Sequence, residues 1–82
     1  MMSARVLIAD DHAVVRAGLR QMLAEDKAVG EIGEAATGQQ TLERLRERLG
    51  ELLILDIGMP DRSGMDILRH VRSGYPETRV LI

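Results

Sequence analysis

Short apolar runs alternate with segments of helical periodicity along the whole of this 82-residue chain. Each apolar run has the length of a buried strand, although the second run is half polar. The four runs are residues 5–9 (RVLIA), 31–35 (EIGEA), 51–56 (ELLILD) and 79–82 (RVLI). Strands that alternate with helices over short connections predict a parallel sheet with helices on its faces. The sequence therefore predicts one open α/β domain of the order βαβαβαβ.

The segments between these runs place their apolar residues on one side of a helix. The predicted inner faces are Val15, Leu19 and Met22 in residues 12–25, Leu42, Leu45 and Leu49 in 39–49, and Ile67, Leu68 and Val71 after residue 63. Gly50 is expected to follow the end of the second helix. The third helix is expected to begin with a capping box, in which Ser63 is the N-cap and Asp66 is N3. Gly74 and Pro76 are expected to end it.

Three carboxylates follow the first and third predicted strands. Asp10 and Asp11 come directly after the first strand, and Asp56 comes at the end of the third. In a flavodoxin-like strand order these two strands are neighbours, and ligands bind at their carboxyl ends. Carboxylates that meet there repel one another, and a divalent cation such as Mg²⁺, which prefers oxygen ligands, removes that conflict. We expect Asp11 to bind Mg²⁺ directly and Asp10 to orient a bound water, because successive strand residues point to opposite faces.

Each of these residues also has an ordinary structural interpretation. Asp11 could serve only as a helix N-cap, and Asp56 could be only the first polar residue of a loop. Gly58 and Pro60 could be turn residues without any further role. His12 follows the acidic pair, but no second histidine lies near it in the sequence, so it is not expected to bind a metal.

Charge and composition exclude several classes of function. The net charge of −2 and the single aromatic residue, Tyr75, argue against nucleic-acid binding by this segment. There is no long apolar run and no basic-then-apolar leader, so neither a membrane span nor a secretory signal is expected. Without cysteine the chain has no disulfide and no thiolate metal site. By elimination we expect a cytoplasmic protein.

Two motifs together resemble the receiver domain of two-component response regulators. They are VLIADDH (residues 6–12) and LLILDIGMPDRSGMDIL (52–68), which contains the pattern D-x-x-M-P-x-x-x-G. The resemblance extends over essentially the whole chain and implies a flavodoxin-like (CheY-like) doubly wound parallel sheet. DDHAVVRAGLRQML and EAATGQQTLERL resemble most closely the subgroup with a C-terminal LuxR-type DNA-binding helix-turn-helix.

The resemblance implies a role for each residue that matches the motifs. Asp56 matches the phosphoacceptor, which takes a phosphoryl group from a phosphohistidine of a sensor histidine kinase or a phosphotransfer protein. The residues that match the Mg²⁺ ligands are Asp10, Asp11, Asp56 and the carbonyl of Gly58. The residues that would shape the surrounding loop are Met59, Pro60 and Gly64. Such a domain is a signalling switch and not an enzyme, since it assists only its own phosphorylation and dephosphorylation.

The chain departs from the family where the sequence ends. Complete receivers have a fifth strand, with a Ser or Thr just after the fourth strand and a Lys at the end of the fifth. No residue here matches these positions, because the chain ends at Ile82 and its one lysine, Lys27, follows the first helix. We therefore expect residues 1–82 to be the N-terminal part of a receiver, without the fifth strand, the last two helices and the DNA-binding output.

This truncation predicts self-association, because the fourth strand would be an exposed apolar edge and the first helix would lack part of its cover. The main alternative function is accordingly a non-signalling fragment that acts only as a self-associating interaction module. An Mg²⁺-dependent phosphatase with an aspartyl nucleophile is less favoured, because such sites usually have a second acid where Gly58 stands. A nucleotide-binding domain is least favoured, because the first strand–helix turn has acids in place of glycines.

Overall fold

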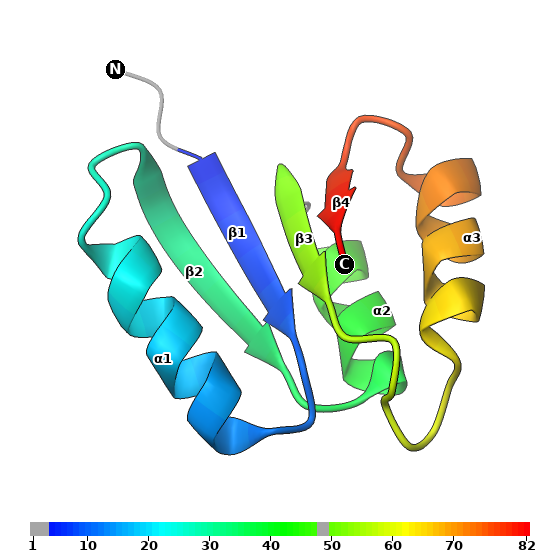
Figure 1. The fold of residues 1–82 in the computed structure, drawn as a ribbon. Helices are drawn as coiled ribbons and strands as arrows, with labels where there is room; N and C mark the ends of the chain where they lie inside the picture. Colours follow the sequence, from blue (N-terminus) through cyan, green and yellow to red (C-terminus); the bar gives the residue numbers. More distant parts are fainter. Residues whose placement is uncertain (1–3, 48–49) are drawn as a thin grey trace.

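The computed structural model describes residues 4–47 and 50–82, in which four strands alternate with three helices (Figure 1). In chain order the elements are β1 (Ala4–Ala9), α1 (Ala13–Ala24), β2 (Val29–Ala35), α2 (Gly38–Glu47), β3 (Leu52–Leu55), α3 (Gly64–Gly74) and β4 (Arg79–Leu81). All neighbouring strands are parallel, and their order across the sheet is β2-β1-β3-β4. The predicted βαβαβαβ order and the flavodoxin-like strand arrangement are therefore confirmed.

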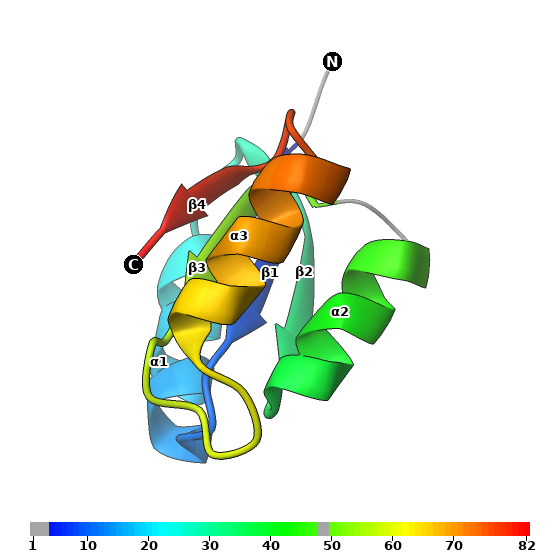
Figure 2. The ribbon, with the colours of Figure 1, turned by 90° about the vertical axis from the view of Figure 1, so that its right-hand side faces the viewer.

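The helices cover the two faces of the sheet unequally. α1 lies on one face, and α2 and α3 lie on the other (Figure 2). The main core lies between the sheet and α2 and α3, where alternate strand residues meet the inner faces of the two helices. Its largest members are Leu7, Leu42, Leu45, Leu53, Leu55, Met59, Ile67 and Val71, all of them buried. This core fixes the carboxyl ends of β1 and β3, from which the candidate site is built.

The face that α1 presents to the sheet differs from the predicted one. Val15 and Met22 are 45% and 69% exposed, and no residue of α1 is buried. The half-buried apolar residues are Leu19 and Leu23, so the prediction of a Val15–Leu19–Met22 face was wrong in two of its three members. Polar contacts, which apolar periodicity does not register, also hold this helix to the sheet. Arginines on α1 bond to β2 and thereby set how the helix rests on the sheet.

The inner faces of the other two helices agree with the prediction. Leu42 and Leu45 of α2 are buried, whereas Leu49 lies outside the described residues. In α3, Ile67 and Val71 are buried and Leu68 packs against the core. None of the helices in the described ranges is long and apolar enough to cross a membrane.

The predicted start of α3 is only partly correct. Ser63 is the N-cap, and its hydroxyl oxygen accepts a hydrogen bond from the Met65 amide at 3.1 Å. Asp66, which was expected to complete a capping box, forms an ion pair with Arg69 on the next turn. Its carboxylate is therefore directed along the helix and not back toward the N-cap. The helix ends at Gly74, as predicted.

The strands differ from their predicted bounds by no more than two residues. β2 begins at Val29, two residues earlier than expected, because Val29 pairs with Ala4 of β1 and the Ala4 amide bonds to the Ala28 carbonyl at 2.7 Å. β3 is shorter than predicted, since Glu51 and Asp56 flank it and do not belong to it. The carboxylate of Asp56 thus follows the last residue of the strand directly.

Candidate functional site

The carboxyl ends of β1 and β3 bring the predicted acids together. Ala9 of β1 pairs with Leu55 of β3, and the Asp56 amide donates to the Ala9 carbonyl at 2.8 Å. Because the strands are parallel neighbours, the residues that follow them share one edge of the sheet. One ligand atom each from Asp10, Asp11, His12 and Asp56 can be chosen so that all four lie within 4.8 Å of one another. The convergence of the three acids is therefore as predicted.

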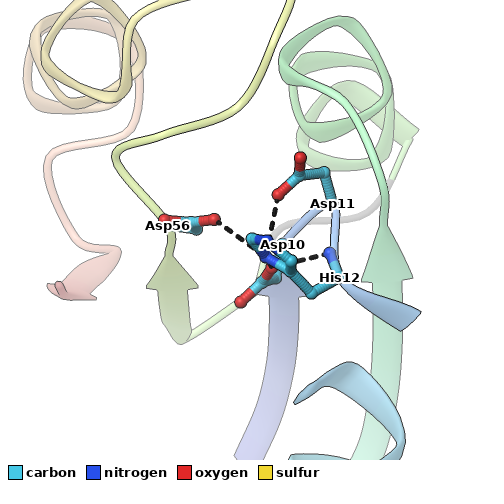
Figure 3. Close-up of side chains that lie close together, drawn as sticks. All are labelled: Asp10, Asp11, His12 and Asp56. Carbon is cyan, nitrogen blue, oxygen red and sulfur yellow. Dashed lines mark hydrogen bonds and ion pairs between the residues drawn. The ribbon is translucent and has the colours of Figure 1, made fainter. Parts of the chain in front are cut away.

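His12 lies in the middle of this acidic cluster, which the sequence did not indicate. Figure 3 shows the carboxylates of Asp11 and Asp56 directed toward its ring. The ring nitrogen Nδ1 is 2.8 Å from Oδ1 of Asp10, 3.0 Å from Oδ1 of Asp11 and 3.7 Å from Oδ2 of Asp56. The same Asp10 oxygen also accepts a hydrogen bond from the His12 amide at 2.8 Å. His12, and not Asp11, is the N-cap of α1, although its side chain forms no capping bond.

Mutual electrostatics shift the pKa of both Asp10 and His12. Burial alone would raise the pKa of Asp10, but the hydrogen bonds and charge of His12 outweigh it and lower that pKa. The pKa of His12 is raised from its ordinary 6.5, chiefly by its hydrogen bond to Asp10 and then by the charge of Asp11. Because the pKa of His12 is raised in the folded state, this pairing stabilises the fold fully at pH values below the ordinary pKa of 6.5. The stabilisation is lost as the pH rises through the raised pKa.

Replacing Asp10 by asparagine is expected to return the pKa of His12 toward 6.5, because the substitution removes both the carboxylate hydrogen bond and its charge. An NMR titration of the His12 ring protons in metal-free buffer measures the change, and a His70→Gln variant identifies which signals belong to His12. Asp66→Asn is the matched control, since Asp66 pairs with Arg69 on α3. An equal midpoint in the Asp10 variant and the wild type would contradict this electrostatic coupling.

Arg16 of α1 connects the backbone of Asp10 to β2. Its Nη1 donates to the Asp10 carbonyl at 2.6 Å, and its Nε donates to Glu34 of β2 at 3.1 Å. The pKa of Glu34 is lowered, first by a hydrogen bond from Arg20 and with a smaller contribution from Arg16. These bonds fix the turn that carries the first two acids. One sequence pattern could have predicted these bonds: two arginines, Arg16 and Arg20, lie one helical turn apart and precede a strand that contains Glu34.

Two glycine amides form hydrogen bonds within the loop between β3 and α3. Oδ1 of Asp56 accepts a hydrogen bond from the Gly58 amide at 3.1 Å, which restricts the carboxylate. The Gly64 amide donates to the Ile57 carbonyl at 3.1 Å, and a methyl group at Gly64 would lie 2.5 Å from the Ile57 Cα. Only glycine fits at Gly64 without a shift of the backbone. At Gly58 a methyl group would meet ordinary contact distances, so space alone does not require glycine there.

The two remaining residues expected to shape this loop differ in their surroundings. Met59 is 5% exposed and belongs to the main core, so it anchors the loop from within. Pro60, which follows it, is exposed.

The N-terminus of α2 binds a carboxylate from the same loop, a contact that the sequence analysis missed. The Gly38 and Gln39 amides donate to Oδ1 and Oδ2 of Asp61 at 2.7 and 3.0 Å. The next amide, that of Gln40, donates to Oγ1 of Thr37 at 3.0 Å. The pattern Thr-x-x-Gln at residues 37–40 is a capping-box signature that would have located the start of this helix. Nothing local in the sequence points to Asp61.

The donor set of this cluster fits Mg²⁺. Three carboxylates supply the hard oxygen ligands that Mg²⁺ takes, and one or two of them are sufficient because the ion retains several waters. The side chains of Asp10, Asp11 and Asp56 are 14%, 30% and 27% exposed, so solvent reaches the cluster. Asp10 and Asp56 also line a hollow of about 310 Å³ beside the sheet edge. The His12 side chain is 65% exposed to solvent.

A flavodoxin-like sheet with acids converging where β1 and β3 end defines a small α/β domain with an acidic pocket at the edge where such sheets bind ligands. The response regulator receiver domain family matches residues 6–82 of the chain. The chain belongs to this family, whose members are signalling domains of two-component systems and not conventional enzymes.

The chain is similar to transcriptional regulators and to their isolated receiver domains. It is 35% identical over 78 residues to the uncharacterised transcriptional regulatory protein YhcZ of Bacillus subtilis, and 32% identical over 77 residues to the response regulator GacA of Pseudomonas viridiflava. These matches cover 95% and 94% of the chain and 36% of each relative, so the chain spans about a third of their length.

A solved structure of the isolated receiver domain of RcsB from Salmonella enterica, obtained with the phosphomimetic BeF₃⁻, has the same fold. Its TM-score is 0.88 at 26% identity, and the match covers 95% of this chain and 59% of the other. The fold in Figure 1 is therefore that of a receiver domain, as the sequence motifs predicted.

Proposed function

We propose that this chain accepts a phosphoryl group on Asp56 in an Mg²⁺-dependent reaction, with a phosphohistidine of a sensor histidine kinase or a phosphotransfer protein as donor. The observation that carries the proposal is the position of Asp56, which directly follows β3 and lies close to two further carboxylates. Carboxylates that lie this close repel one another, and a divalent cation with oxygen ligands would relieve that repulsion. Membership in the receiver family supports the signalling role.

In the proposed reaction a carboxylate oxygen of Asp56 attacks phosphorus. A P–O bond forms while the P–N bond of the phosphohistidine breaks, and the bonding pair passes to the imidazole nitrogen. The stiff end of β3 and the Gly58 amide hold the nucleophile in place, which lowers the entropic part of the barrier. Mg²⁺ would be bound by Asp10, Asp11, Asp56 and the carbonyl of Gly58, and it would neutralise charge on the transferring phosphoryl group.

Relay of the phosphorylated state needs groups that these 82 residues do not supply. Lys27 lies between α1 and β2, at the opposite end of the parallel sheet from the acids, and it cannot reach a phosphoryl group on Asp56. We infer that the proposed signal is passed on by other parts of a longer regulator. Because the relatives are named as transcriptional regulators, we propose control of transcription in the cytoplasm as the output, through a DNA-binding domain outside this segment.

The proposal predicts that the chain gains one phosphoryl group when it is incubated with Mg²⁺ and acetyl phosphate. Intact-mass spectrometry measures the adduct, and the expected product is a single addition that disappears when EDTA replaces Mg²⁺. The Asp56→Asn variant should gain nothing, because an amide is not a comparable nucleophile. Asp61→Asn is not a suitable control here, since Asp61 contacts the same loop. Asp26→Asn, in the loop before β2, serves instead and should react like the wild type.

A folded wild-type chain that shows no adduct would contradict the proposal and would favour the second candidate, a self-associating interaction module. The observation behind that candidate is exposed apolar surface at β4 and on α1. Leu81 and Ile82 are 57% and 61% exposed, and Val14 is 85% exposed. Sedimentation of the same sample distinguishes the two, because the interaction module requires a dimer or larger species while phosphoryl acceptance does not.

A further inference from the structure

We propose that Asp61 is a positioning residue, which fastens the β3–α3 loop to the N-terminus of α2 and so holds the Gly58 carbonyl at the metal site. The inference rests on the proposed Mg²⁺ function and assigns to it a residue outside the acidic cluster. Asp61 contacts neither the ion nor the phosphoryl group in this proposal. It acts through the loop alone.

Both carboxylate oxygens of Asp61 are used at α2. Oδ1 accepts from the Gly38 amide at 2.7 Å, and Oδ2 accepts from the Gln39 amide at 3.0 Å. These are the first two amides of the helix, which have no partner within it. A negative charge at a helix N-terminus is further favoured by the helix dipole. The contact therefore connects two segments, 23 residues apart in sequence, by charge-assisted bonds.

The fit around this contact shows that the loop approaches α2 closely. A methyl group at Gly38 would lie 2.7 Å from Cβ of Arg62, the residue after Asp61. A side chain at position 38 would therefore push the loop away. The two amide hydrogen bonds also lower the pKa of Asp61, because they favour its charged carboxylate.

Asp61 stands where the loop is otherwise exposed. Gly58 is exposed, Met59 is buried in the core, and residues 60–63 are again exposed before α3 begins. Gly64 closes the loop at its base through the Ile57 carbonyl. The outer part of the loop thus has Asp61 as its attachment to α2. Without this attachment the outer loop, and with it Gly58, would be less fixed relative to the acids, and Mg²⁺ binding would lose affinity.

Mg²⁺ titration of the 82-residue chain, followed by the amide NMR signals of residues around the acids, tests this inference. We expect Asp61→Asn to weaken Mg²⁺ binding about tenfold, at the lower end of the range for groups that orient metal ligands. Before any Mg²⁺ is added, the Gly38 and Gln39 amides should exchange faster with solvent, because their acceptor has lost its charge. The rate of phosphorylation at saturating Mg²⁺ should recover, whereas a direct catalytic role would leave it reduced.

Thr37→Ala is the matched control for helix stability. It removes the acceptor of the Gln40 amide at the same helix end but leaves the loop attached, so Mg²⁺ affinity should remain that of the wild type. Gly38→Ala is the second variant, in case Asp61→Asn does not fold. It displaces the loop sterically while it keeps every charge, and it should weaken Mg²⁺ binding in the same way.

The outcomes separate the inference from the proposed function. A wild-type chain without Mg²⁺-dependent shifts would overturn the proposed function and the inference together. A wild type that binds Mg²⁺, with an Asp61→Asn variant that binds equally well, would overturn the inference alone. Equal weakening by Thr37→Ala would also overturn it, because the effect would then come from the helix end and not from the loop.

Discussion

Replacing Gly64 by alanine is expected to destabilise the domain by about 3 kcal/mol, at the upper end of the usual range for overpacking. The added methyl group would lie 2.5 Å from the Ile57 Cα and 3.1 Å from the Ile57 carbonyl oxygen, so backbone would have to move. No flexible side chain can absorb this overlap. The movement would also open the Gly64–Ile57 hydrogen bond that closes the β3–α3 loop. Mg²⁺ affinity should therefore fall together with stability.

Gly18→Ala is the matched control, because it makes the same chemical change with the opposite expected effect. A methyl group at Gly18 in α1 would meet nothing within 4 Å. Alanine in an exposed helix interior is favoured over glycine by about 0.5–1 kcal/mol, so this variant should be more stable than the wild type. Urea unfolding followed by circular dichroism measures both. A Gly64 variant as stable as the wild type would show that the loop can shift without strain.

The parts of this fold that the sequence predicted are those that depend on local pattern and on topology. The apolar runs located all four strands, and the spacing of Ile67 and Val71 identified the inner face of α3. The meeting of Asp10 and Asp56 followed from the flavodoxin-like strand order, in which their two strands are parallel neighbours whose carboxyl ends share an edge. No contact between side chains had to be known in advance.

The parts that the sequence did not predict depend on contacts between distant polar groups. Arg16 and Glu34 orient α1 on the sheet, and apolar spacing carries no information about such a pair. Asp61 and Gly38 meet only because the fold brings a loop to a helix end. His12 was set aside as a metal ligand because no second histidine lies near it, yet its ring nitrogen lies among the carboxylates. The sequence analysis did not consider that His12 directly follows two acids. A histidine in that position interacts electrostatically with the acids whether or not it binds a metal.

Two adjacent residues of β3 are expected to differ strongly in their contribution to stability, because the strand separates two unequal faces. Leu53 is fully buried against α2 and α3, and truncation of such a leucine to alanine costs about 3 kcal/mol in transfer and cavity terms. Ile54 points to the α1 face and is only half-buried, so Ile54→Ala should cost about 1 kcal/mol.

For a domain of this size the loss at Leu53 is a large fraction of its total free energy of unfolding, commonly about 5–15 kcal/mol. Leu53→Ala should therefore unfold at much lower urea concentration, while Ile54→Ala should unfold close to the wild type. Both are measured by urea titration with circular dichroism, at two protein concentrations. If the two variants lose equal amounts of stability, and the loss grows with protein concentration, another copy of the chain covers Ile54. A residue that is half-exposed in the single chain could not otherwise contribute as much stability as a fully buried one.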